Sequence, residues 1–494
     1  MAIPKVCGIE TEFGIAVLGG GDANPVTASS LLVNAYVEHR RVGWDFEDES
    51  PGRDARGFAR DDASPPEVEA HLVNTVLANG ARYYVDHAHP EFSSPECTDA
   101  LQLVCYDKAG ERILARSMAA ASRLLSGGRE IVVYKNNSDG KGNSYGCHEN
   151  YLIDRAVPFS TLVRHLLPWF VTRQVVAGSG KVGAEHGGDP VPYQISQRAD
   201  FFEEEVGLET TLKRPIINTR DEPHADPQRY RRLHVIVGDA NLCEISTFLK
   251  LGATTIVLSM IEDGFLDKDL SLAAPIRALR AISHDPTCRG VVERSDGSTT
   301  TAVEIQWEYF RLARKYAEET GLDGCGGQVG FDVLTRWEAA LEALETEPRR
   351  LNGVLDWVTK LCLLEAYADR HGLEWDNPKL ALVDLQYHDV RPGRSLYERL
   401  VRSGRVERLA TEEEIETAIV EPPPTTRAYF RGKCLARWPD AVVAANWDSL
   451  MLDVGGDPLK RIPMLEPLRG TKAHVGELLE QCATPAELIA RLSA

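Results

Sequence analysis

Short apolar runs rich in β-branched residues dominate the first half of the chain, for example residues 130–135 (EIVVYK) and 234–237 (HVIV). Later, apolar positions recur at three- and four-residue intervals along residues 304–316 and 354–367, and the first of these stretches ends before Gly321. The first pattern predicts strands and the second predicts helices. Strands followed by helices are typical of an α+β fold around a mostly antiparallel sheet, which is the fold class we expect.

Proline marks the clearest break in this pattern. Residues 421–426 (EPPPTT) contain three consecutive prolines, which stop regular structure and stiffen a connection. We therefore predict one large domain over residues 1–424 and a small C-terminal domain over residues 425–494. Residues 484–487 (TPAE) match a capping box with proline at the first helical position, which predicts a closing helix.

Residues 45–66 form a second irregular stretch. Charge, glycine and proline are dense there, and no periodicity is visible. A long solvated loop and a mobile loop near an active site are both compatible with this composition.

Composition excludes several classes of protein. The 494 residues carry a formal net charge of −19, so a general nucleic-acid-binding surface is not expected, and an anionic ligand needs a local basic pocket. No uninterrupted apolar run is long enough to predict a membrane span, and the N-terminus shows no secretory signal. The ten cysteines form no Cys-x-x-Cys pair. We expect reduced thiols and a cytoplasmic location.

Two carboxylates stand two positions apart in the strand-like segment of residues 8–14 (GIETEFG). Because alternate side chains of a strand share a face, Glu10 and Glu12 are expected side by side. Carboxylates this close repel one another unless a cation or a basic side chain neutralises them. On an exposed edge the pair would serve solubility alone, but the apolar flanks Val6 and Ile15 favour a buried strand.

A second strand-like segment, residues 81–97, is dense in ionisable groups. Arg82, Tyr84 and Asp86 alternate, so one face of this strand carries a guanidinium, a phenol and a carboxylate. An ion pair between Arg82 and Asp86 that only stabilises the fold is the simpler interpretation. It leaves Glu91 and Glu96, which follow the strand, unexplained.

These carboxylates suit a hard cation. Mg²⁺ takes oxygen ligands from carboxylates and from substrate phosphates, and Glu10, Glu12, Asp86 and Glu91 could supply them. Softer metals would favour histidine and cysteine groupings, which the sequence lacks. Arg82 suits a phosphate. Magnesium together with a nucleotide is therefore the expected cofactor.

Other candidate residues leave more than one interpretation open. His148, Glu149 and Asn150 are candidate ligands or substrate contacts, although a single histidine in a strand is often a core residue. Residues 177–183 (AGSGKVG) resemble a phosphate-binding loop but lack its first glycine and its Ser or Thr after the lysine, so we reject that motif. The densest basic group is a candidate anion site or a solvated face, and it consists of Lys213, Arg214, Arg220, Arg231 and Arg232.

Many motifs, in one order along essentially the whole chain, resemble the Dop and PafA family. They are residues 8–14, 84–91 (YVDHAHPE), 135–137 (KNN), 148–151 (HENY), 218–224 (NTRDEPH), 232–241 (RLHVIVGDAN), 385–387 (LQY), 426–431 (TRAYFR) and 446–449 (NWDS).

The resemblance implies a fold and a set of site residues. The fold is related to glutamine synthetase, in which a curved antiparallel sheet forms a cradle for ATP and Mg²⁺ and a small C-terminal domain packs beside it. Asp86 matches the catalytic aspartate of the family. The remaining matches fall into three groups: magnesium ligands Glu10, Tyr84 and Glu91; further metal contacts Glu12 and His234; and nucleotide contacts Arg82, Ser94 and Trp447.

The family contains two opposite activities. PafA-type ligases join the C-terminal glutamate of Pup, a small acidic disordered protein, to a target lysine. Dop-type hydrolases deamidate the C-terminal glutamine of Pup and cut the isopeptide bond of pupylated proteins. Residues 50–58 (SPGRDARGF) match an extra loop of the Dop type that PafA lacks, although residues 58–65 are shorter than in that type. The resemblance therefore implies a Pup deamidase and depupylase that uses ATP, or ADP with phosphate, and Mg²⁺; a PafA-type ligase is the alternative.

Overall fold

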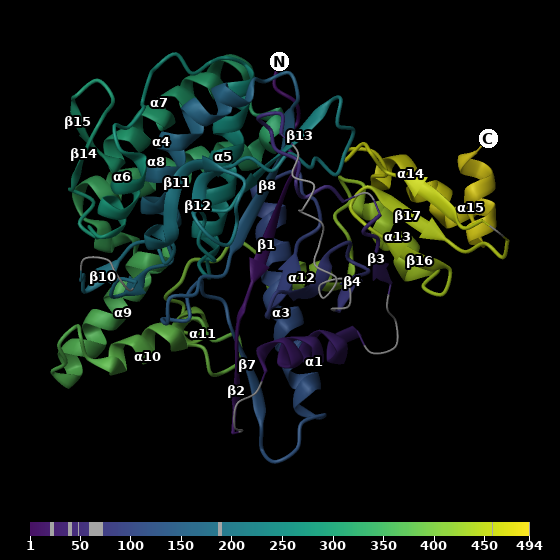
Figure 1. The fold of residues 1–494 in the computed structure, drawn as a ribbon, viewed down its shortest axis with the longest axis horizontal. Helices are drawn as coiled ribbons and strands as arrows, with labels where there is room; N and C mark the ends of the chain where they lie inside the picture. Colours follow the sequence, from purple (N-terminus) through teal and green to yellow (C-terminus); the bar gives the residue numbers. More distant parts are fainter. Residues whose placement is uncertain are drawn as a thin grey trace.

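The structure, a computed structural model, describes residues 1–19, 24–37, 42–47, 49–58, 73–185, 190–456 and 458–493. Its centre is a ten-stranded sheet in which all neighbouring strands are antiparallel except the parallel pair β3 and β16 (Figure 1). In spatial order the strands are β13 (Tyr230–Val235), β8 (Cys147–Asp154), β1 (Cys7–Glu12), β6 (His89–Ser93), β5 (Arg82–Asp86), β4 (Asn74–Val76), β3 (Gly43–Trp44), β16 (Val442–Ala445), β17 (Ser449–Leu452) and β18 (Lys460–Pro463).

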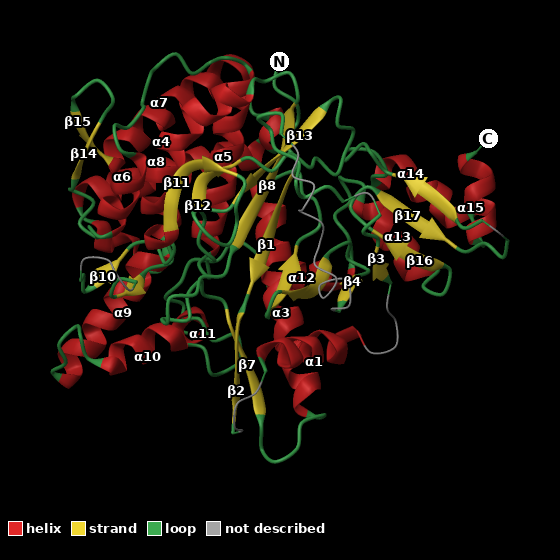
Figure 2. Ribbon diagram, viewed as in Figure 1, coloured by secondary structure: helices red, strands yellow, loops and turns green. Residues whose placement is uncertain are grey.

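Four two-stranded ribbons and a set of helices surround this sheet (Figure 2). The ribbons are β2 (Gly14–Leu18) with β7 (Glu130–Tyr134), β9 (Lys181–Val182) with β10 (Tyr193–Gln194), β11 (Phe202–Gly207) with β12 (Arg214–Asn218), and β14 (Val291–Glu293) with β15 (Thr299–Thr301). The helices are α1 (Pro25–Val37), α3 (Ala100–Ser122), α4 (Phe159–Ala177), α5 (Glu244–Glu262), α6 (Pro275–Ser283), α7 (Ala302–Thr320), α8 (Gln328–Thr346), α9 (Asp356–His371), α10 (Pro378–Tyr387), α11 (Leu396–Arg402), α12 (Glu412–Val420), α13 (Ala428–Arg437), α14 (Lys472–Gln481) and α15 (Pro485–Leu492).

Helix α3 covers the apolar face of the sheet. On β1 and β6 that face carries the buried side chains of Ile9 and Phe92. Gly110 of α3 lies directly on Phe92, because a Cβ at this position would approach the ring to 2.5 Å. Since alternate side chains of a strand point to opposite faces, burial of this set leaves the other face of the same strands for polar residues.

Helix α5 is long and apolar enough to cross a membrane by composition, but it is completely buried within the protein. It packs against α3, α4, α7 and α8, and its residues belong to the main hydrophobic core. Such complete burial of an apolar helix is typical of the central helix of a large hydrophobic core.

The structure confirms the expected α+β class and most of the predicted elements. The helical periodicity of residues 304–316 lies within α7, which begins with a capping box between Thr301 and Glu304. At α15 the Thr484 side chain accepts a hydrogen bond from the Glu487 N–H, as predicted. The Glu487 carboxylate, however, accepts from the N–H of Ala483 at 2.7 Å, one residue before the expected partner.

The C-terminal segment extends the sheet instead of standing apart from it. Strand β16 pairs with β3, with Ala444 opposite Gly43 and Ala445 opposite Trp44. A second hydrophobic cluster joins Val76 and Trp44 to α13, α14 and α15. The segment, yellow in Figure 1, therefore packs at the end of the sheet that β3 and β4 form. The boundary at residue 424 stays a prediction.

Candidate active site

On the polar face of the sheet, ionisable side chains from neighbouring strands lie next to one another. Glu10 lies opposite His148 of β8, and Glu12 lies opposite Glu91 of β6. On the far side of β6, Glu91 faces Tyr84 of β5. Because directly paired residues share a face, the predicted alternation of Glu10 with Glu12 holds, and the pair meets the second strand at Glu91.

One cluster on this face consists of Glu12, Asp86 and Glu91, whose nearest carboxylate oxygens lie within 4.8 Å of one another. Glu91 is buried, with 2% of its surface exposed. Burial, together with the charges of Asp86, Glu12 and Glu10, raises the pKa of Glu91 well above its ordinary value. Three carboxylates at this separation repel one another, and an oxygen-seeking divalent cation would remove that repulsion. The donor set therefore fits Mg²⁺.

A second cluster consists of Glu10, His148 and His234, again with one ligand atom from each within 4.8 Å of the others. The Asn150 side chain donates a hydrogen bond to Glu10 Oε1 at 2.8 Å, and its own oxygen lies 2.9 Å from His234 Nδ1. Burial opposes ionisation of Glu10, but the hydrogen bond with His148 and the charges of His234 and Arg232 outweigh it and lower the pKa of Glu10. Glu10 is therefore an ionised carboxylate close to two imidazoles.

Arg82 is held between two aromatic rings. Its guanidinium carbon lies 3.9 Å from the ring centroids of both Trp44 and Tyr84, and its Nε donates to Asn74 at 2.9 Å. Cation–π contacts of this kind fix the guanidinium plane. Arg82 lies opposite Ser93 of β6, whose Oγ lies 3.4 Å from the Tyr84 hydroxyl.

Asp86 ends β5 at a strained turn. The next residue, His87, has a φ of 51°, a conformation that non-glycine residues rarely adopt and that is found at functional sites. His87 Nδ1 lies 3.1 Å from Asp86 Oδ1. Burial opposes the charge of Asp86, but this hydrogen bond and the nearby His87, His148 and Arg82 lower its pKa. Asp86 is therefore ionised at neutral pH.

A cavity continues from Glu10 toward the beginning of β1. Ser94 and Trp447 line it, together with Asn150 and Arg232. Ser94 Oγ accepts a hydrogen bond from the Ile9 N–H at 3.0 Å, which joins the cavity wall to β1.

The structure thus brings all nine predicted site residues together, although their roles stay predictions. Seven of them lie on the polar face of the sheet: Glu10, Glu12, Arg82, Tyr84, Asp86, Glu91 and His234. The other two, Ser94 and Trp447, line the cavity that Glu10 also lines.

Sequence reasoning missed the ion-pair cluster of Glu96, Arg427 and Arg431. Glu96 lines the cavity and accepts a hydrogen bond from Arg427 Nε at 2.7 Å, and it also pairs with the fully buried Arg431. Arg431 in turn donates to the Trp447 carbonyl oxygen at 3.1 Å and lies 5.1 Å from the Trp447 ring. Two arginines lower the pKa of Glu96 to about 2 although burial opposes its charge. The cluster fixes Trp447 at the edge of the cavity.

The structure shows the contacts of two further candidates from the sequence, Glu149 and the basic group. Glu149 lies on the apolar side of β8, where Arg173 of α4 binds it through two hydrogen bonds of 2.7 Å. In the basic group Arg231 donates to the Val157 carbonyl oxygen, and Arg214 donates to the carbonyl oxygens of Thr210 and Ser144. Arg232 is the member that lines the cavity, so the five basic residues do not form one anion site.

The irregular stretch of residues 45–66 reaches the cavity wall. Residue 48 and residues 59–66 lie outside the described residues. In the described part, Thr219 Oγ1 donates to Asp54 at 2.7 Å, and the Ser50 N–H donates to Glu222. Glu222 also lies 3.7 Å from both His224 and Arg232, which line the cavity.

Comparison with known proteins agrees with this geometry. The family model described as Pup-ligase protein matches residues 5–451 of the chain. The chain belongs to the Pup-ligase family. Two relatives in this family are the protein named depupylase from Acidothermus cellulolyticus, at 56% identity, and the Pup deamidase/depupylase of Mycolicibacterium smegmatis, at 50% identity, each over 99% of both chains. A Pup–protein ligase from Nakamurella multipartita is 41% identical over 96% of this chain and 99% of its own.

Two solved structures of the Pup-ligase family share the fold. The ligase PafA in complex with Pup matches with a TM-score of 0.83 and 35% identity, over 97% of this chain and 92% of the other. PafA in complex with ADP matches with a TM-score of 0.76 and 36% identity, over 90% of this chain and 97% of the other.

Proposed function

We propose that this chain is a Pup deamidase and depupylase. It hydrolyses the side-chain amide of the C-terminal glutamine of Pup and the isopeptide bond between Pup and a substrate lysine, with ATP and Mg²⁺ as cofactors. The observation that carries the proposal is that the chain has higher sequence identity to relatives named as hydrolases than to relatives named as ligases. Relatives named for the hydrolase are 50–56% identical to the chain, whereas four relatives named Pup–protein ligase are 40–42% identical over nearly the same length.

The stretch of residues 49–58 supports the hydrolase over the ligase. It carries the sequence that resembles the extra loop of the Dop type, and it is fastened to Thr219 and Glu222 beside the cavity. A segment that only the hydrolase branch possesses thus contacts the wall of the candidate active site. Loops of this kind commonly adapt one fold to different reactions.

The cavity and the polar face together suit a magnesium nucleotide. Ser94 and Trp447 would contact the nucleotide in the cavity, and Arg82 would bind a phosphate group. Glu10, Tyr84 and Glu91 would hold Mg²⁺, with Glu12 and His234 as further metal contacts. When bound, the metal would stabilise negative charge that develops on a reacting carbonyl oxygen. The ADP-bound PafA relative supports the nucleotide part of this assignment.

Asp86 is proposed as the catalytic carboxylate. It is ionised, it projects from the end of a strand, and the His87 turn fixes its position. An ionised carboxylate can attack the δ-carbonyl carbon and expel ammonia or the lysine amine to form an anhydride that water then hydrolyses, or it can accept a proton from an attacking water. In a single turnover in ¹⁸O-labelled water, label in the Asp86 carboxylate identifies the anhydride, because a water activated by Asp86 places its oxygen only in the Pup product.

We also propose that the chain works in a reducing cytoplasm and divides near residue 424. All ten cysteines are free, and eight of them are buried. Thiols so placed suit a compartment in which disulfides do not form.

A gel assay with two substrates tests the proposed function. A Pup-conjugated protein and Pup ending in glutamine are each incubated with the enzyme, ATP and Mg²⁺, and EDTA is added to a parallel sample. Release of free Pup and formation of Pup ending in glutamate, both lost with EDTA, are expected. If the enzyme releases nothing but joins Pup ending in glutamate to a lysine substrate, the chain is a ligase and the hydrolase proposal is wrong.

A further inference from the structure

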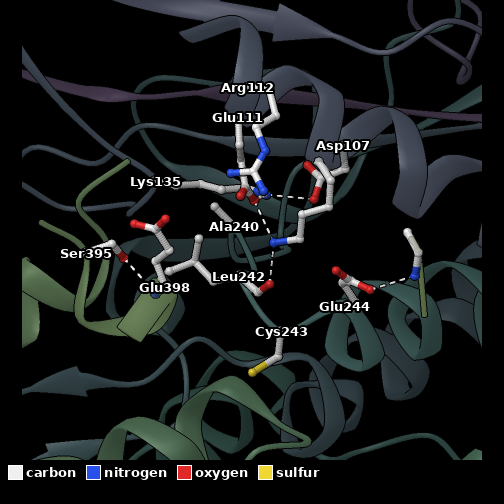
Figure 3. Close-up of polar contacts among 12 residues, drawn as sticks. Asp107, Glu111, Arg112, Lys135, Ala240, Leu242, Cys243, Glu244, Ser395 and Glu398 are labelled. Carbon is white, nitrogen blue, oxygen red and sulfur yellow. Dashed lines mark hydrogen bonds and ion pairs between the residues drawn. The ribbon is translucent and has the colours of Figure 1, made fainter. Parts of the chain in front are cut away.

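A second cavity lies behind the sheet, on the side covered by α3. Its walls come from α3, from the residues around the start of α5, and from α11 with the loop before it (Figure 3). The polar face with Asp86 points the other way, because α3 packs on the apolar face through Gly110 and Phe92. None of the predicted site residues lines this cavity.

Helix α3 directs three charged side chains into the cavity: Lys108, Glu111 and Arg112. Positions separated by three and four residues share one face of a helix, so this set is a single surface. Lys108 donates to Glu111 Oε1 at 2.9 Å and to the Leu242 carbonyl oxygen at 2.5 Å. Lys135, at the end of β7, binds the same Glu111 oxygen at 2.8 Å and Asp107 at 2.7 Å.

Every charged side chain that lines the cavity already has a partner of opposite charge. On the acidic side, Glu111 pairs with lysines, and three others pair with arginines: Glu244 with Arg408, Asp389 with Arg391, and Glu398 with Arg402. On the basic side, Arg112 pairs with Glu412 at 3.0 Å. Lys108 and Glu244 are buried, so a ligand with a net charge would leave one charge uncompensated beside them, which is unfavourable. The lining therefore selects a molecule whose own charges sum to zero.

Several hydrogen-bonding groups in this wall remain open among the described residues. The Tyr397 side chain is 6% exposed and lines the cavity, yet its buried hydroxyl has no hydrogen-bond partner. Both lysines use Oε1 of Glu111, which leaves Oε2 as an acceptor. Arg112 donates only through Nη2, and Lys108 uses two of its three protons. Buried polar groups are nearly always paired, so the unpaired Tyr397 hydroxyl indicates a place for a polar partner in this wall.

The rest of the lining is apolar. Leu242, Val390, Pro392 and Val401 face the same space. A ligand that fits must combine a donor for Glu111, an acceptor for the open N–H and O–H groups, and a short hydrocarbon part.

We propose that this cavity binds a free α-amino acid with an aliphatic side chain. The ammonium group donates to Glu111 Oε2, and the carboxylate accepts from Arg112 and from the Tyr397 hydroxyl. The aliphatic part packs on Val390 and Val401. The zwitterion has no net charge, so it leaves the existing ion pairs balanced.

Isothermal titration calorimetry of the full chain with L-leucine tests the proposal. Two analogues serve as matched probes: 4-methylpentanoate, which lacks the ammonium group, and 3-methylbutylamine, which lacks the carboxylate. L-leucine is expected to bind with one-to-one stoichiometry. Each analogue is expected to have an affinity at least about tenfold lower, because it lacks one charged contact. Absence of binding by L-leucine up to about 10 mM, or equal binding by either analogue, overturns the proposal.

Three variants separate the cavity from its surroundings. Tyr397→Phe removes only the hydroxyl, and Arg112→Gln removes the proposed carboxylate contact, so both should weaken L-leucine binding, Arg112→Gln by about tenfold. Arg116→Gln is the matched control, because Arg116 lies one turn further along α3 and pairs with Glu416 as Arg112 pairs with Glu412, but it does not line the cavity. Equal affinities of the Arg112 and Arg116 variants would contradict the assigned site.

Discussion

Glu91 is a residue whose negative charge is unfavourable in the absence of a cation. It is buried, and Asp86, Glu12 and Glu10 all disfavour its ionised form. Glu91→Gln keeps the shape of the side chain and removes this repulsion. In EDTA the variant should therefore resist urea better than the wild type, by about 1–3 kcal/mol in the free energy of unfolding.

The same substitution removes a proposed magnesium ligand. Added Mg²⁺ should therefore stabilise the wild type against urea but leave Glu91→Gln nearly unchanged, and depupylation by the variant should fall sharply. A variant that is less stable than the wild type in EDTA would show that the three carboxylates do not strain the metal-free protein.

Asp86 carries a different prediction, because its role is chemical. Asp86→Asn should lower the rate of Pup release by about 10²–10⁴-fold, the usual contribution of a nucleophile or general base. Nucleotide affinity, measured by fluorescence titration, should change by no more than about twofold, since Asp86 does not line the nucleotide cavity. Asp269→Asn, at an exposed ion pair with Arg164, is the control and should keep full activity. Joint loss of activity and nucleotide binding would make Asp86 a structural residue.

At the scale of residues, the sequence predicted which side chains share a face where both belong to a single strand. The two-residue period placed Glu10 with Glu12, and Tyr84 with Asp86, without knowledge of neighbouring strands. It could not separate His148 from Glu149, because the decisive partner of Glu149 is Arg173 on a distant helix.

At the scale of elements, Glu96 links the segment that follows β6 to α13 through its ion pairs with Arg427 and Arg431. Its folded-state pKa of about 2 lies below the ordinary value of 4.5, so its charge stabilises the protein above pH 4.5, and this contribution is lost as the pH falls toward 2. The shift corresponds to about 3 kcal/mol. Glu96→Gln should lower the free energy of urea unfolding by roughly this amount at pH 7, and the difference should shrink by about 1 kcal/mol per pH unit below 4.5.

The control for Glu96→Gln is Glu416→Gln. Glu416 pairs with Arg116, but about half of each side chain is exposed, and such pairs contribute about 0–1 kcal/mol. A Glu96 difference that stays constant from pH 7 to pH 3.5 would exclude the charge of Glu96 as its cause. This cluster could not be predicted, because Glu96 and Arg431 share no local pattern and meet only when β6 and α13 pack together.

At the scale of the whole molecule, distant parts of the chain line the proposed nucleotide cavity. Ser94 comes from the first hundred residues and Trp447 from the C-terminal segment. ATP with Mg²⁺ should therefore stabilise both parts together and raise a single melting transition. At a hundred times its Kd the nucleotide contributes about 2.7 kcal/mol. Trp447→Ala should lose most of this shift in differential scanning fluorimetry, whereas Trp375→Ala, beside Tyr193, should keep it. Two separate transitions, of which only one responds, would mean that the parts melt independently.

At the largest scale, local periodicity predicted the class of fold but not which strands pair with one another. Local periodicity identifies strands such as β7 and helices such as α7, since each depends on neighbouring residues. It does not show which strands pair across long separations. The three prolines at residues 422–424 predict a boundary, but no local pattern around them shows that β16 beyond it pairs with β3.

The pairing of β3 with β16 has a consequence for synthesis on the ribosome. Gly43 and Trp44 are made at the beginning of translation, and their partners Ala444 and Ala445 are made near its end. Until then β3 has one unpaired edge, and the apolar surface around Trp44 and Val76 lacks its cover. Exposed edges and apolar surfaces of nascent chains attract chaperones and promote aggregation. The full sheet is therefore a product of completed translation, and early termination leaves an aggregation-prone chain.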